Sequence, residues 1–160
     1  MIVYHGSNVV AEQPRLIHQN RFLDFGFGFY TTTNHTQAVN FAEKVAERRK
    51  TGKPIVNIYQ IDERIAFEQC DLLQFDGADA AWLDFVAANR NGTYLGKQYD
   101  LVFGAVANDD VYRTLTLYMN GLLTRDQSLE QLKIRRLFNQ LVFSTDRALQ
   151  FLHFERWESV

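Results

Sequence analysis

Phe25-Gly26-Phe27-Gly28-Phe29-Tyr30-Thr31-Thr32 has the pattern of a glycine-rich turn that leads into a short strand. Two glycines one residue apart favour a tight turn, and the aromatic and β-branched residues after them favour extended chain. The pair Gly26-x-Gly28 is not a dinucleotide-binding fingerprint, because the third glycine is missing and no regular strand-helix-strand unit surrounds it. The stretch therefore predicts a tyrosine, Tyr30, held at the start of a strand beside a sharply bent backbone.

Two further short strands are predicted near the ends of the chain. Ile2-Val3-Tyr4 is an apolar run that ends in His5-Gly6-Ser7, and residues 139–144 form a late strand that carries Gln140. A histidine at a strand end, a tyrosine after a turn and a polar residue on a late strand can converge on one cleft. We therefore take His5, Tyr30 and Gln140 as candidate catalytic residues.

Periodicity predicts the other elements. Helical spacing of apolar residues indicates helices over 36–50, 79–89, 108–120 and 128–136, with a last turn in 146–152. Apolar runs indicate strands over 55–61 and 100–107, and another within 65–75. Asn34 or Thr36, and Asn108 or Asp109, are suited to cap helices. Because strands and helices do not alternate regularly, we expect an α+β fold with a split, mostly antiparallel sheet.

Length and composition set broad limits. A chain of 160 residues with 46% hydrophobic and 22% charged residues fits a single domain over 1–160. The net charge of -2 argues against a general polyanion binder but allows a local basic patch. No apolar run approaches the ~20 residues that cross a bilayer, and no signal peptide precedes the first strand, so we expect a cytoplasmic protein without membrane contact.

Cysteine and histidine usage points away from metal or disulfide chemistry. Cys70 is the single cysteine and has no partner for a disulfide or a zinc site, so we expect a small buried apolar residue. His18, His35 and His153 show no metal-ligand spacing with one another or with Cys70. We predict no metal site.

The ordered motifs resemble the His-Tyr-Glu group of ADP-ribosyltransferases, which contains diphtheria toxin and the poly(ADP-ribose) polymerases. The resemblance extends over residues 4–154. It includes His5-Gly6-Ser7, the Gly28-Phe29-Tyr30 stretch, an aromatic residue eleven positions after Tyr30 (Phe41, preceded by Asn40), and Asn139-Gln140. The chain also looks like a small bacterial family that carries the strings His-Gly-Ser, Asp-Phe-Gly-x-Gly-Phe-Tyr and Ala-Asn-Asp-Asp.

This resemblance implies two small antiparallel sheets with peripheral helices around a cleft for NAD, which is a substrate. It implies that His5 bonds the ribose next to nicotinamide, and that Gly6 and Ser7 bond the carboxamide. Tyr30, with Gly28 and Thr31 beside it, would stack on the pyridine ring. Phe41 would be a second stacking ring, although its helical spacing by itself favours a core position. Arg21 or Arg15 could neutralise pyrophosphate.

The residue at position 140 departs from the family pattern, because Gln140 stands where the catalytic glutamate is expected. A glutamine can keep a hydrogen bond to the ribose 2′-hydroxyl, but it carries no charge and takes up no proton. Losing such a contribution can cost on the order of a hundredfold in rate. Another carboxylate could substitute, and Asp109 or Asp110 are the candidates. Their plainer interpretation is the first turn of a helix.

The resemblance implies an NAD-dependent mono-ADP-ribosyltransferase of the toxin type, from a toxin-antitoxin or phage-defence system, with a macromolecular acceptor and an antitoxin partner. The alternatives are an NAD- or ADP-ribose-binding module without turnover, which the glutamine favours, and a purely structural interaction domain. A basic cluster before the last motif suits an acidic or nucleic-acid acceptor, or equally a solvated helix face: Arg125, Lys133, Arg135 and Arg136. Asp24 is expected to fix the glycine turn through an Asx-type bond.

Overall fold

The computed structural model describes residues 1–18, 21–135 and 137–160. These residues form seven strands and six helices. The strands are β1 Ile2–Ser7, β2 Phe29–Thr32, β3 Ile55–Gln60, β4 Leu72–Gln74, β5 Leu101–Ala105, β6 Asn139–Phe143 and β7 His153–Ser159. The helices are α1 His35–Arg49, α2 Glu63–Gln69, α3 Ala80–Arg90, α4 Asp109–Met119, α5 Arg125–Lys133 and α6 Asp146–Leu149. The fold is α+β, as predicted.

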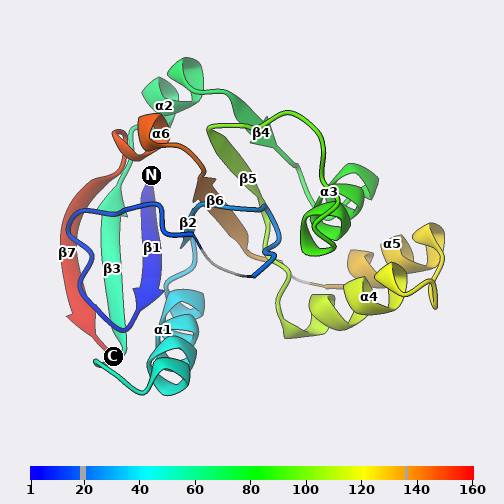
Figure 1. The fold of residues 1–160 in the computed structure, drawn as a ribbon, viewed down its shortest axis with the longest axis horizontal. Helices are drawn as coiled ribbons and strands as arrows, with labels where there is room; N and C mark the ends of the chain where they lie inside the picture. The colour runs from blue at the N-terminus through cyan, green and yellow to red at the C-terminus, as the bar shows by residue number, and fades with distance from the viewer. Residues whose placement is uncertain (19–20, 136) are drawn as a thin grey trace.

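All seven strands belong to one mixed sheet in the order β4-β5-β6-β2-β1-β3-β7. β4 and β5 are parallel because α3 connects them as a crossover, and the other pairs are antiparallel. The expectation of two small sheets is therefore replaced by one continuous sheet. Its β7-β3-β1 half and its β6-β5-β4 half nevertheless run in different directions (Figure 1).

The junction between these halves is the β1–β2 pair. In the described residues, β1 and β2 are in register at Tyr4 and Thr32, whereas β1 and β3 pair over six positions. The ladder between β1 and β2 thus ends just before His5. The candidate site lies next to this break in the ladder, because His5-Gly6-Ser7, the first predicted motif, follows it directly.

Helices cover both faces of the sheet. Val102 and Val142 pack with α3, α4 and α5 in one apolar cluster. The neighbouring residues Leu101 and Leu141 point to the opposite face, where they pack with α2 and α6. α1 packs on the β1–β3 half through Ala38 and related small residues. Among the described residues, no helix has both the length and the apolar character needed to cross a membrane.

Most predicted elements are present, with local corrections. The strand expected within 65–75 is wrong in its first part, because Asp62 caps helix α2 there by accepting from the Ile65 amide at 3.2 Å, before β4 begins. The helix expected over 128–136 begins earlier, at Arg125, because Thr124 forms a capping box with Gln127. Arg136 lies outside the described residues. Cys70 is buried in the apolar cluster, as predicted.

Candidate functional site

The three candidate catalytic residues lie on three adjacent strands. Gln140 is on β6, Tyr30 is on β2 and His5 is on β1, and β2 is the middle strand of the three. Registers fix their spacing along the sheet, since Thr32 is opposite Gln140 on one side and opposite Tyr4 on the other. Tyr30 and Gln140 point to the same face of the sheet, because Tyr30 pairs with Val142, two positions from Gln140 on β6. The His5 side chain points to the other face, so the predicted convergence holds for Tyr30 and Gln140 but places His5 across the sheet from them.

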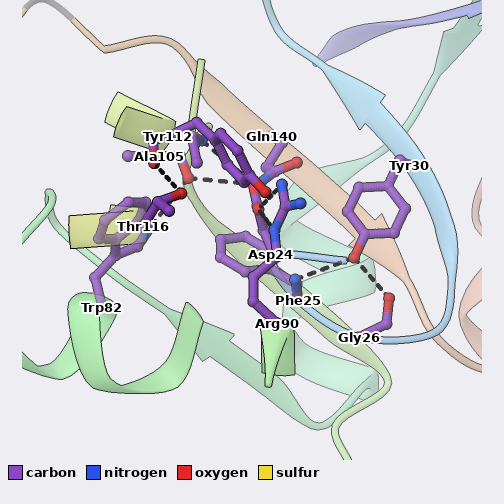
Figure 2. Close-up of polar contacts among 11 residues, drawn as sticks. Asp24, Phe25, Gly26, Tyr30, Trp82, Arg90, Ala105, Tyr112, Thr116 and Gln140 are labelled. Atoms are coloured by element: carbon purple, nitrogen blue, oxygen red, sulfur yellow. Dashed lines mark hydrogen bonds and ion pairs between the residues drawn. The ribbon is translucent and has the colours of Figure 1, made fainter. Parts of the chain in front are cut away.

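Tyr30 is anchored by its hydroxyl to the glycine turn. Its Oη donates to the Gly26 carbonyl at 2.6 Å and accepts from the Phe25 amide at 3.0 Å (Figure 2). Burial, with a smaller contribution from the charge of Asp24, raises the pKa of Tyr30 far above its ordinary value. Tyr30 is therefore a neutral phenol, and its ring is the part of the side chain left to contact a ligand.

The turn itself depends on glycine. Gly26 has φ +77°, and a Cβ there would lie 2.8 Å from Asn89 Oδ1. Gly28 approaches β6 closely, since a Cβ would lie 2.6 Å from a Val142 methyl carbon. The predicted glycine turn is thus confirmed as the feature that lets the Tyr30 hydroxyl reach back to the backbone.

Half-buried His5 is held in one tautomer. Its Nδ1 lies 2.7 Å from the Tyr30 carbonyl oxygen, which can only accept, so Nδ1 carries the proton and donates. The ring stacks on Phe29 at 4.2 Å, on the face opposite the Tyr30 ring. Burial lowers the pKa of His5, an effect that the Tyr30 bond partly offsets and the charge of Arg49 reinforces. Nε2 is therefore a hydrogen-bond acceptor near neutral pH.

The predicted ligand-binding residues near His5 make contacts within the protein itself. A Cβ on Gly6 would lie 2.3 Å from the Ala38 carbonyl oxygen, so close packing of α1 requires glycine here. The Ser7 side chain is buried and its hydroxyl accepts from the Val9 amide at 3.4 Å. Thr31 is buried and donates to the Leu141 carbonyl at 2.7 Å.

Gln140 is 5% exposed and belongs to a polar cluster with Asp24 and Arg90. Its Nε2 donates to Asp24 Oδ2 at 3.3 Å and to the Ala105 carbonyl at 3.4 Å (Figure 2). Asp24 is buried as well and forms an ion pair with Arg90, whose guanidinium nitrogen lies 2.5 Å from Oδ1. The sequence predicts only a local Asx-type bond for Asp24, and the structure gives it these long-range contacts instead.

Asp109 and Asp110 lie in the first turn of α4 and are exposed. Asn108 caps this helix by accepting from the Val111 amide at 3.0 Å, which confirms it as the cap. The Asp109 side chain is 92% exposed and pairs with Lys44 at 3.0 Å, while Asp110 lies 3.8 Å from Arg135. The carboxylate in hydrogen-bonding contact with Gln140 is Asp24, which the sequence pattern did not single out for this role.

The second predicted stacking residue and the predicted phosphate-binding arginines are exposed. Phe41 is 45% exposed on α1, so the core position favoured by its spacing is wrong. Arg21 is exposed and lines a pocket of about 410 Å³ with Arg90 and Tyr112. The pKa of Arg21 is lowered, first by partial burial and then by the positive charges of Arg48 and Arg90. Arg15 is exposed too, outside this pocket lining.

The described part of the basic cluster is largely neutralised by acidic neighbours. Arg125 pairs with Asp84 at 2.5 Å and Lys133 pairs with Glu130 at 2.7 Å. This pairing favours the interpretation as a solvated helix face. The described ranges contain no group of three His, Cys, Asp or Glu side chains that could hold a metal ion.

Comparison with known proteins places the chain in a family. The family described as "Protein of unknown function (DUF3990)" matches residues 1–154. The chain belongs to this family. No curated protein and no solved structure matches it. The matched range includes β1, β2 and β6, and therefore the whole of the region described above.

Proposed function

We propose that this protein is an NAD-dependent mono-ADP-ribosyltransferase. The observation that carries the proposal is the order β6-β2-β1, which brings Gln140, Tyr30 and His5 onto neighbouring strands. The resemblance to the His-Tyr-Glu transferases predicts this set of side chains in this order along the chain. The proposal includes the fold of that group, with the cleft at the junction of the two halves of the sheet.

The nicotinamide end of NAD would bind where the β1–β2 ladder ends. Past Tyr4 and Thr32, the two strands are bridged by the His5 side chain, so backbone groups of Gly6 and Ser7 can meet the carboxamide. The exposed Phe41 ring would stack on the pyridine ring together with Tyr30. Arg21 would meet the pyrophosphate, since its guanidinium already lies near other cations and lacks an acidic partner among the described residues.

The chemistry proposed is cleavage of the bond between nicotinamide and ribose. The electron pair of the C–N bond leaves with nicotinamide, an oxocarbenium-like centre develops at the ribose C1′, and an acceptor nucleophile bonds to C1′ and loses a proton to solvent. His5 Nε2 would accept from a ribose hydroxyl. Gln140 Oε1 would accept from the 2′-hydroxyl and place its negative dipole end near the developing charge. An uncharged amide suits single transfer better than polymer elongation.

The cellular role follows from the resemblance alone. Compact stand-alone transferases of this kind resemble toxins of toxin-antitoxin or anti-phage systems. We propose a toxin-type effector that modifies a macromolecule and is neutralised by a partner protein.

A second candidate is an NAD- or ADP-ribose-binding module without turnover. Gln140 favours it, because a neutral amide bound to Asp24 supplies neither a charge nor a proton acceptor to the ligand. The two candidates share the binding site and differ in the fate of NAD.

One experiment separates these functions. The purified protein is incubated with NAD labelled in the adenylate half, together with fractionated bacterial protein, RNA and DNA. We expect nicotinamide release and label on one macromolecular fraction. NAD binding without release would support the binding module. A folded protein that neither binds NAD nor releases nicotinamide would refute both.

Phe41→Ala tests the binding geometry. Because Phe41 is an exposed residue on α1, we expect the free energy of unfolding to change by less than about 0.5 kcal/mol. Loss of one stacking face should weaken NAD binding by about tenfold, which is ~1.4 kcal/mol. Leu122→Ala is the matched control, since Leu122 is 71% exposed in the turn after α4. Equal NAD affinity in both variants would contradict the assigned stacking role.

A further inference from the structure

The orientation of the Gln140 amide is determined by its neighbours. Nε2 faces Asp24 Oδ2 at 3.3 Å and the Ala105 carbonyl oxygen at 3.4 Å. A backbone carbonyl has no proton to give, and a carboxylate ion-paired with arginine has none either, so the NH₂ group must point at them. The amide oxygen then points away from this pair, to the side on which Tyr30 lies (Figure 2). No donor among the described residues is in hydrogen-bonding contact with that oxygen.

The group that orients Gln140 is itself fixed. Asp24 Oδ1 accepts from Arg90 Nε at 2.6 Å, and Oδ2 accepts from the Ala107 amide at 3.2 Å. The Arg90 guanidinium lies over the Tyr112 ring, 5.0 Å from its centre. The partners of Asp24 therefore come from α3, from β6 and from the segment after β5. Such a carboxylate cannot turn to follow a moving amide, so it holds the amide in one orientation.

We propose that Asp24 is a positioning residue for the transfer reaction: it fixes the Gln140 carboxamide so that Oε1 accepts from the ribose 2′-hydroxyl of NAD. The inference rests on the proposed function. It adds the residue that orients Gln140, so that a glutamine can bind the ribose at position 140. Asp24 itself does not touch NAD. It acts through Gln140, and Arg90 keeps it in place.

The same contacts explain why a glutamate does not suit position 140 in this chain. A carboxylate there would face the Asp24 carboxylate and the Ala105 carbonyl at hydrogen-bonding distance, with no donor between them. Two carboxylates this close do not both ionise readily. The glutamate would either take up a proton or turn away from the site. Gln140→Glu alone is therefore expected to lower turnover, although it restores the residue of the family pattern.

The test is a double-mutant cycle made of Asp24→Asn, Gln140→Glu and the combination of both. Thermal unfolding and the kcat and KM for nicotinamide release are measured for each purified protein. Asp76→Asn is the matched control, because it removes the charge of an exposed aspartate outside the site. We expect Asp24→Asn to lower kcat by on the order of tenfold to a hundredfold, with a smaller change in KM, because the amide loses its fixed orientation.

In the combination, the asparagine amide introduced at position 24 can donate to the glutamate carboxylate introduced at position 140. We therefore expect a higher melting temperature and a higher kcat than in Gln140→Glu alone, which is a non-additive result. Two outcomes overturn the inference: a folded Asp24→Asn protein with wild-type kcat, or a Gln140→Glu protein that is faster than wild type while Asp24 is present. If wild-type protein neither binds NAD nor releases nicotinamide, the proposed function fails and this role fails with it. An active wild type with an unaffected Asp24→Asn variant removes this role alone.

Discussion

His5 shows how one half-buried imidazole connects the fold to pH. Its Nδ1–H is committed to the Tyr30 carbonyl, and burial, reinforced by the charge of Arg49, lowers its pKa below 6.5. The unfolded chain takes up a proton at about pH 6.5. Between this value and the lower pKa of the folded state, the unfolded chain binds more protons. The free energy of unfolding must therefore fall as the pH drops from 7 into this window.

We predict that His5→Asn removes part of this acid sensitivity, because asparagine can donate to the Tyr30 carbonyl without titrating. Urea unfolding of wild type and variant at pH 7 and at about pH 5 gives the comparison. His153→Asn, at an exposed histidine, controls for the loss of any histidine. An unchanged pH dependence in His5→Asn would show that His5 does not titrate as described.

Tyr30→Phe tests the attachment of the glycine turn. The substitution keeps the ring and leaves the Gly26 carbonyl and the Phe25 amide without the hydroxyl. We expect a loss of about 1–3 kcal/mol in the free energy of unfolding, from chemical denaturation. NAD affinity of the folded protein should change little, because the ring is retained. Wild-type stability in Tyr30→Phe would contradict the two hydrogen bonds.

At the scale of elements, the start of α4 distinguishes a cap from a catalytic carboxylate. Asn108→Ala should cost about 1 kcal/mol of stability, since the Val111 amide loses its acceptor. Asp109→Asn should cost about 0.3–1 kcal/mol, because it removes one charge from the positive end of the helix. We expect both variants to keep their NAD turnover. Loss of turnover in Asp109→Asn with stability retained would instead assign catalysis to Asp109.

Helix α2 shows where a local pattern is misleading. Apolar residues on both sides of Cys70 suggest one strand, whereas the chain forms α2 and then β4. The contrary signal is Asp62, directly after a strand and followed by Glu63, which is the composition of a helix start. Long helices such as α1 are predictable because their apolar spacing and their cap, Asn34, agree.

At the scale of the whole molecule, the sequence predicts which strands carry His5, Tyr30 and Gln140, and the sheet order then places these three strands side by side. It does not predict that the His5 side chain points to the opposite face from Tyr30. It does not predict the role of Asp24. The partners of Asp24 are 66, 83 and 116 residues away in Arg90, Ala107 and Gln140, and no local pattern encodes contacts of that range. The sequence does not predict the single mixed sheet for a similar reason. The parallel pairing of β4 with β5 depends on α3 packing against the sheet, which is a long-range contact.

The most direct test is a crystal structure of the protein soaked with NAD or a non-cleavable NAD analogue. We predict the nicotinamide ring between Tyr30 and Phe41 at the end of the β1–β2 ladder. We also predict Gln140 Oε1 within about 3.2 Å of the ribose 2′-hydroxyl, with Nε2 still bound to Asp24. A nicotinamide bound elsewhere on the molecule, or a Gln140 side chain that does not contact the ribose, would contradict the account.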